Sequence, residues 1–231
     1  MFPAQDRSFR LFAFSGIQVY LHWSWFLVAI YELMVRRERY TSPVWNVAEY
    51  LALFGIVLLH EFGHSLACRQ VGGRADEIVL WPFGGIAFLA TPQRPGATLW
   101  SVAAGPLVNV VLAPVLFGVT WLAKTQGLLE PYPNLDNFLY DVQRLNLMLL
   151  IFNLLPIYPL DGGQILRSLL WYLTGPATSL LVATVIGFVG IAGLAVLALL
   201  RQSVFTGLVA FFLFSSCLAG FNRARAMRGG G

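Results

Sequence analysis

Residues 60–64, His60-Glu61-Phe62-Gly63-His64, place three ionisable side chains inside an otherwise apolar stretch of this chain. The ten residues before them, 50–59, contain no charged side chain, so a lipid bilayer would accept them. Ionisable groups within a membrane-spanning helix are costly and indicate a functional site by default. The stretch therefore predicts a membrane-spanning helix that carries a site of chemistry. Buried histidines satisfied only by hydrogen bonds are the alternative, but they would leave Glu61 without a role.

The spacing of the two histidines points to a metal. Residues four apart on a helix share a face and rise about 6 Å, so His60 and His64 can converge on one ion. A histidine pair of this spacing with a glutamate after the first is typical of a zinc site in which the glutamate is the general base. We predict one zinc ion per chain, with Glu61 in that role.

Composition supports a membrane protein. The chain has 231 residues, of which 58% are apolar and only 11% charged, and its mean hydropathy is +0.70. Soluble domains carry about 25% charged residues. We expect an all-α polytopic membrane protein with about six transmembrane helices and a small membrane-associated β-hairpin. The net charge of +4 comes without a basic cluster interleaved with aromatics, so we expect no nucleic-acid partner.

Apolar runs separated by polar segments predict the organisation of the chain as a single transmembrane domain over residues 1–231. The spans are expected at about 21–35, 44–70, 97–123, 138–173 (broken near 156–161), 177–200 and 204–221, with the hairpin at about 76–90. Residues 222–231 form a basic, glycine-rich tail, which indicates that the natural chain continues further. Lysine and arginine fall more often on the side of the termini, so we expect termini in the cytoplasm.

The third metal ligand is predicted by elimination. A catalytic zinc keeps three protein ligands and one open position, and the chain has only three histidines. His22 is interpreted as an interfacial residue, with a position facing the active site as the alternative. Most carboxylates lie at loops or helix ends, whereas Asp161 lies between two apolar stretches, after Pro156 and Pro159, which break the helix. Asp161 is therefore the candidate, against the alternative of a stray aspartate in a kinked helix.

Residues 78–89 do not have the pattern of a helix. They are rich in β-forming side chains and interrupted by Pro82, Gly84 and Gly85, which predicts two short strands folded back on each other. Non-helical backbone at membrane depth needs cover from protein or access to water. The hairpin is thus a candidate for pairing with an extended substrate, with an ordinary interfacial hairpin as the alternative.

Three motifs together resemble the site-2 protease family of intramembrane zinc metalloproteases. They are His60 to His64, Gly105-Pro106-Leu107-Val108-Asn109, and Asn153-Leu154-Leu155-Pro156 followed by Leu160-Asp161-Gly162. The turn Pro82-Phe83-Gly84-Gly85-Ile86 is similar to that family's membrane-embedded hairpin. The resemblance covers residues 15–175. Members often carry a PDZ insertion or a C-terminal CBS pair, and this chain resembles the form without them.

The resemblance implies a role for each residue of these motifs. It implies zinc ligation by His60, His64 and Asp161 and general base catalysis by Glu61. Asn109 and Asn153 would contact substrate or the developing oxyanion. Pairing with the substrate strand would involve Phe83, Gly84, Gly85 and Ile86.

The implied function is hydrolysis of peptide bonds within or near transmembrane segments of membrane proteins, as in regulated intramembrane proteolysis. The expected partners are a single-pass membrane protein substrate and the lipid bilayer, and the expected location is a prokaryotic cell membrane. A metal-binding transporter or channel is the alternative. Transport favours ligands along a path through several spans, and the sequence contains no second cluster of ligands.

Overall fold

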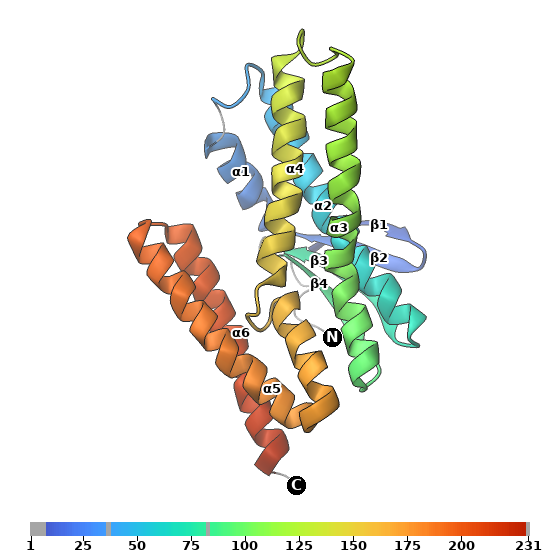
Figure 1. The fold of residues 1–231 in the computed structure, drawn as a ribbon, viewed down its shortest axis with the longest axis vertical. Helices are drawn as coiled ribbons and strands as arrows, with labels where there is room; N and C mark the ends of the chain where they lie inside the picture. The colour runs from blue at the N-terminus through green and yellow to red at the C-terminus, as the bar shows by residue number, and fades with distance from the viewer. Residues whose placement is uncertain (1–7, 36–37, 82–83, 230–231) are drawn as a thin grey trace. The chain divides into compact units, whose positions relative to one another are not determined.

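The computed structural model describes residues 8–35, 38–81 and 84–229. Along the chain, coloured blue to red in Figure 1, two strands and two helices are followed by two strands and four helices. The strands are β1 Ser8–Phe14, β2 Ile17–His22, β3 Arg74–Trp81 and β4 Gly84–Ala90. The helices are α1 Trp25–Val35, α2 Pro43–Gln70, α3 Pro95–Thr125, α4 Pro133–Leu154, α5 Asp161–Leu200 and α6 Val204–Gly229. The predicted fold class, mainly helical with a small hairpin, is confirmed.

Four of the six helices in the described residues are long and apolar enough to cross a membrane: α2, α3, α5 and α6. The chain is therefore a multi-pass membrane protein. Helix α1 has 11 residues, which gives it a length of about 16 Å, about half of the hydrocarbon thickness. Helix α4 has 22 residues but includes the charged residues Asp136, Asp141 and Arg144. The positions of individual spans remain predictions.

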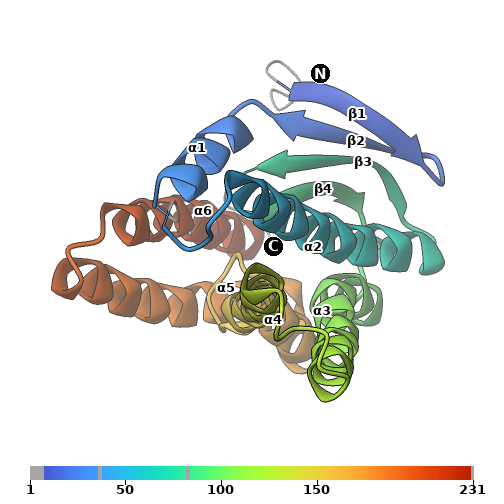
Figure 2. The same ribbon diagram turned by 90° about the horizontal axis from the view of Figure 1, so that it is seen from above.

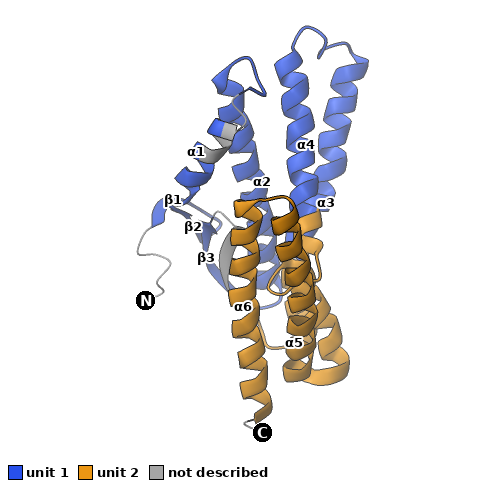
Figure 3. Ribbon diagram, turned by 90° about the vertical axis from the view of Figure 1, so that its left-hand side faces the viewer, with its two compact units in different colours: residues 1–90, 104–150 blue, residues 91–103, 151–231 orange. Residues whose placement is uncertain are grey.

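The chain divides into two compact units, distinguished by colour in Figure 3. Unit 1 comprises residues 1–90 and 104–150, and unit 2 comprises residues 91–103 and 151–231.

Unit 1 contains a sheet of four strands in the order β1-β2-β3-β4 (Figure 2). β3 and β4 pair as the predicted antiparallel hairpin, and β2 pairs in parallel with β3. Ile17, Val19, Ile78 and Leu80 are fully buried and pack in one cluster with Val57 of α2. Helix α2 thereby covers the sheet. Strand β1 is not predicted, because its sequence is apolar on both faces and lacks the alternation typical of a strand.

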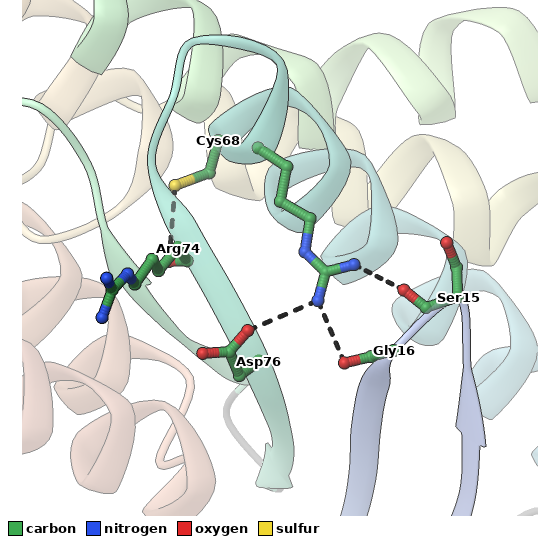
Figure 4. A network of polar contacts seen from close by, with 6 residues as sticks. Ser15, Gly16, Cys68, Arg74 and Asp76 are labelled. Carbon is green, nitrogen blue, oxygen red and sulfur yellow. Dashed lines mark hydrogen bonds and ion pairs between the residues drawn. The ribbon is translucent and has the colours of Figure 1, made fainter.

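Arg69, in the last turn of α2, fastens the helix to the turn between β1 and β2. Its Nη1 donates to the carbonyl of Ser15 at 2.5 Å and its Nη2 to that of Gly16 at 3.0 Å (Figure 4). The same Nη2 lies 3.5 Å from a carboxylate oxygen of Asp76 in β3. Ser15 and Gly16 have φ of 51° and 73°, the left-handed region that a tight hairpin turn requires. One guanidinium therefore holds three segments together.

The helices of unit 2 are interrupted at two places, between α4 and α5 and within α5. α4 ends at Leu154 and α5 begins at Asp161. In the connection, Ile157 donates from its backbone nitrogen to the carbonyl of Leu155 and packs against Ile191 and Leu213. Within α5, Gly175 has non-helical dihedrals (φ 79°, ψ 173°) directly before Pro176, so α5 is two helical segments joined at a kink.

Candidate metal centre

Helix α2 holds His60, Glu61 and His64 in its C-terminal half. The helix begins with Ser42, whose hydroxyl accepts from the backbone nitrogen of Val44 at 3.4 Å, and with Pro43 in the first turn. Residues 50–59 of the helix are apolar and lead directly to the histidines. The side chains of His60, Glu61 and His64 are buried. All three residues lie on one helix, as predicted.

The two imidazoles converge. Their Nε2 atoms lie 3.1 Å apart, and the ring centroids are 4.7 Å apart at an angle of 85°. Two nitrogens bound to one tetrahedral zinc at ~2.0–2.1 Å are separated by about 3.3 Å. The positions of the two Nε2 atoms therefore fit a shared zinc ion.

Small residues let α3 approach this part of α2. A Cβ at Gly63 would lie 2.7 Å from the carbonyl oxygen of Ala104 and 2.8 Å from Cγ2 of Val108. A Cβ at Gly105 would overlap Nε2 of His64. Gly105 therefore leaves the space that the His64 ring occupies. It belongs to the second of the three sequence motifs, and its role here is steric.

Asn109, on α3, contacts the other nitrogen of His60. Its Oδ1 lies 2.7 Å from Nδ1 of His60, and its Nδ2 donates to Oδ1 of Asn146 on α4 at 2.8 Å. Asn146 returns a hydrogen bond from its Nδ2 to the backbone carbonyl of Asn109 at 3.0 Å. Both asparagines have no exposed surface. The network links α2, α3 and α4 within unit 1.

Asn146 is a residue that the sequence reasoning missed. A signal was available, because Asn146 precedes Asn153 by seven residues, which is two turns of helix and the same face. The residues between them are apolar. A buried asparagine in such a run requires a polar partner, but the partner could not be named without knowing which helices meet.

Asp161 and Asn153 belong to unit 2. Asp161 is the first residue of α5 and its side chain is 9% exposed, whereas Asn153 is half-buried near the end of α4. A Cβ at Gly162 would overlap the carbonyl of Leu154, and one at Gly163 would overlap the backbone of Tyr158. The two glycines are thus required for the chain to return tightly from α4 into α5.

The remaining predicted residues lie in or beside the sheet. Gly84, Gly85 and Ile86 begin β4, which is an outer strand of the sheet. Phe83 lies outside the described residues. His22, interpreted from sequence as interfacial, is buried at the end of β2. Its ring stacks on the Trp81 ring with the two ring centroids 4.1 Å apart, and its Nδ1 lies 2.5 Å from the hydroxyl oxygen of Ser24.

Comparison with known proteins places these features in a family. The model of peptidase family M50 matches residues 48–144 and 130–197. The chain is 34% identical to the zinc metalloprotease MJ0392 of Methanocaldococcus jannaschii over 90% of its own length and 58% of that protein. It is 36% identical to stage IV sporulation protein FB of Bacillus subtilis over 50% of its own length and 38% of that protein. It therefore spans less than two thirds of these curated relatives.

A solved structure is similar as well. The site-2 protease from Methanocaldococcus jannaschii aligns with a TM-score of 0.68 and 30% identity, covering 93% of this chain and 95% of that one. Together with the matched family model, this similarity shows that the chain belongs to peptidase family M50, the site-2 protease family.

Proposed function

We propose that this protein is an intramembrane zinc metalloprotease that hydrolyses peptide bonds within or near transmembrane segments of single-pass membrane proteins. The observation that carries the proposal is the convergence of the His60 and His64 Nε2 atoms beside Glu61 on an apolar helix. The relatives named as zinc metalloprotease and site-2 protease support it.

The proposed zinc ligands are His60, His64 and Asp161, with one zinc per chain. Asp161 is the only acidic residue in the sequence of unit 2, and the glycines after it hold the first turn of α5 against the connection from α4. Two imidazoles and one carboxylate form a common donor set of catalytic zinc. When bound, zinc activates water and polarises the carbonyl of the scissile bond.

Glu61 is proposed as the general base. Its side chain is buried and lies one residue after a ligand, so its carboxylate can accept a proton from the attacking water and deliver it to the leaving amide nitrogen. Asn153 is proposed to contact substrate or the developing oxyanion.

Strand β4, at the edge of the sheet, can pair with an extended segment of substrate. Peptide bonds of a helix are engaged in internal hydrogen bonds, so a transmembrane substrate must unwind locally before attack. We propose that the unwound segment pairs with β4 along Gly84, Gly85 and Ile86, as peptides pair with exposed sheet edges elsewhere.

We further propose that residues 1–231 form one transmembrane protease domain with cytoplasmic termini in a prokaryotic cell membrane.

The test combines metal content and cleavage. Wild type and the variants Glu61→Gln, His64→Ala and Asp161→Ala are purified and reconstituted in lipid with a panel of single-pass membrane proteins. We expect cleavage by wild type alone, full zinc in Glu61→Gln, and zinc loss in the two ligand variants. If Asp161→Ala binds as much zinc as wild type, that residue is not a ligand. If wild type neither binds zinc nor cleaves any substrate, the proposed protease activity is refuted. Zinc with transport into vesicles and no cleavage would favour a transporter.

A further inference from the structure

We infer that Asn146 is a positioning residue for the metal site, because it orients Asn109, which in turn holds the His60 ring with Nε2 directed to the metal. The inference rests on the proposed function, since it assigns how one of the two histidines is prepared to bind zinc. It concerns only α2, α3 and α4 of unit 1.

The orientation of the network is set at a backbone atom. The carbonyl oxygen of Asn109 can only accept, so the Asn146 atom 3.0 Å from it must be the donor Nδ2. Oδ1 of Asn146 then faces the side chain of Asn109 at 2.8 Å and requires a donor there. The Asn109 amide is thereby fixed with Nδ2 towards Asn146.

With Nδ2 so placed, Oδ1 of Asn109 faces Nδ1 of His60 at 2.7 Å. An amide oxygen only accepts, so Nδ1 of His60 carries the hydrogen and its Nε2 carries the lone pair that a metal needs. A metal-bound histidine usually donates its other N–H to such an acceptor, which fixes both the tautomer and the ring orientation. Here the acceptor is itself held by a second residue.

Burial makes the arrangement depend on Asn146. Both asparagines are fully buried, so no bulk water can replace a lost partner. Without Asn146, the Asn109 amide could turn over and present Nδ2 to His60, which would favour the tautomer with hydrogen on Nε2. That tautomer cannot bind zinc through Nε2.

The same geometry assigns a role to Asn109. Its carbonyl oxygen is engaged by His60 and its amino group by Asn146. Asn109 therefore acts on His60, and the contact with substrate or the developing oxyanion that the family resemblance implied for it stays a prediction.

The test measures zinc affinity, by competition with a chelator, for the full chain in detergent. Asn146→Leu removes both hydrogen bonds and should weaken zinc binding by about 10–100-fold, as loss of such supporting groups does elsewhere. Asn146→Asp keeps an oxygen that accepts from Asn109 but lacks the donor to the backbone carbonyl, so it should lose less affinity than Asn146→Leu. If Asn146→Leu does not fold, Asn146→Ala removes the same bonds without added bulk.

A matched control lies one turn away on α4. Gln143 donates from Nε2 to the hydroxyl of Thr120, another hydrogen bond between α4 and α3 that does not involve a histidine. Gln143→Leu should leave zinc affinity unchanged. An equal loss in Gln143→Leu and Asn146→Leu would show a general packing effect and overturn the inference.

A double-mutant cycle separates orientation from packing. Asn109→Asp presents an acceptor to His60 whichever way the side chain turns. In that background, Asn146→Leu should change zinc affinity by less than about threefold. A loss of the same size in both backgrounds, or none in either, would overturn the inference. If wild type binds no zinc, the proposed function fails, and the inference fails with it.

Discussion

A missing side chain at Gly105 is what allows His64 to lie against α3. The Cβ of any other residue would overlap Nε2 of His64, the atom that we propose binds zinc. Gly105 is thus as closely connected to the site as the ligands themselves, although it contributes no functional group.

We predict that Gly105→Ala lowers zinc affinity at least about tenfold, since the His64 ring or α3 must shift. Overpacking of this kind also destabilises a fold by about 1–3 kcal/mol. Gly118→Ala is the matched control, because Gly118 lies on the same helix with nothing within 4 Å of the added Cβ. The prediction is checked by chelator competition, and equal zinc affinity in both variants would contradict it.

Polar contacts around the buried side chains of Tyr40 and Asp141 join the connection between α1 and α2 to α4. Arg39 donates from Nε to Oδ2 of Asp141 at 2.8 Å, and the hydroxyl of Tyr40 donates to the same oxygen at 3.1 Å. Asn134 of α4 exchanges hydrogen bonds with Thr41. Consecutive residues of one loop thereby hold the start of α2 in place relative to α4.

Tyr40 makes this cluster sensitive to alkaline pH. Burial, and then Glu49 and Asp141, raise the pKa of Tyr40 well above its usual value of about 10. The folded state therefore holds the phenolic proton more tightly than the unfolded state. That contribution to stability is present below about pH 10 and is lost progressively as pH rises above it.

We expect Tyr40→Phe to lower the free energy of unfolding by about 1–3 kcal/mol at neutral pH, through lost hydrogen bonds to carboxylates. We also expect a weaker decline of its stability between about pH 10 and 12 than in wild type. Chemical unfolding at several pH values measures both. Tyr132→Phe, at a residue 62% exposed, is the control and should behave as wild type. A parallel decline in wild type and Tyr40→Phe would refute the link.

The outer faces of the long helices are suited to contact with lipid. Phe117 of α3, Leu199 of α5 and Phe211 of α6 are each at least 63% exposed. Soluble proteins rarely present such surfaces over whole helices. Polar groups gather instead inside unit 1, in the histidine network and in the cluster around Asp141. In a bilayer these interior polar contacts add specificity that apolar surface alone does not supply.

Zinc is predicted to stabilise the fold as a whole, because the proposed arrangement of ligands exists only in the folded state. At free zinc 100-fold above the dissociation constant, the gain is about 2.7 kcal/mol. Thermal unfolding in detergent should therefore shift to lower temperature when a chelator is added to wild type. His64→Ala should show no such shift, and a shift of equal size in that variant would place the metal elsewhere.

Local patterns in the sequence were sufficient for several features. The histidines and Glu61 share one helix because their spacing and the apolar run around them are local properties. The hairpin of β3 and β4 follows from β-forming residues interrupted by proline and glycine. The high apolar and low charged content of the sequence was enough to predict a membrane protein. Asp161 was also named from sequence, by eliminating other carboxylates, and its ligand role remains a prediction.

Which local elements contact one another depends on how distant segments of the chain pack together. β2 pairs with β3 across more than fifty residues of chain, and β1 joins the sheet although its own pattern does not mark it as a strand. Gly105 and Asn146 matter because α3 and α4 lie beside α2, and a helix's periodicity says which face is buried but not which helix covers it. Local patterns were therefore enough to indicate the membrane class and to name the two histidines of α2 that we propose bind zinc. The groups that orient those residues depend on contacts between distant segments, which no local pattern encodes.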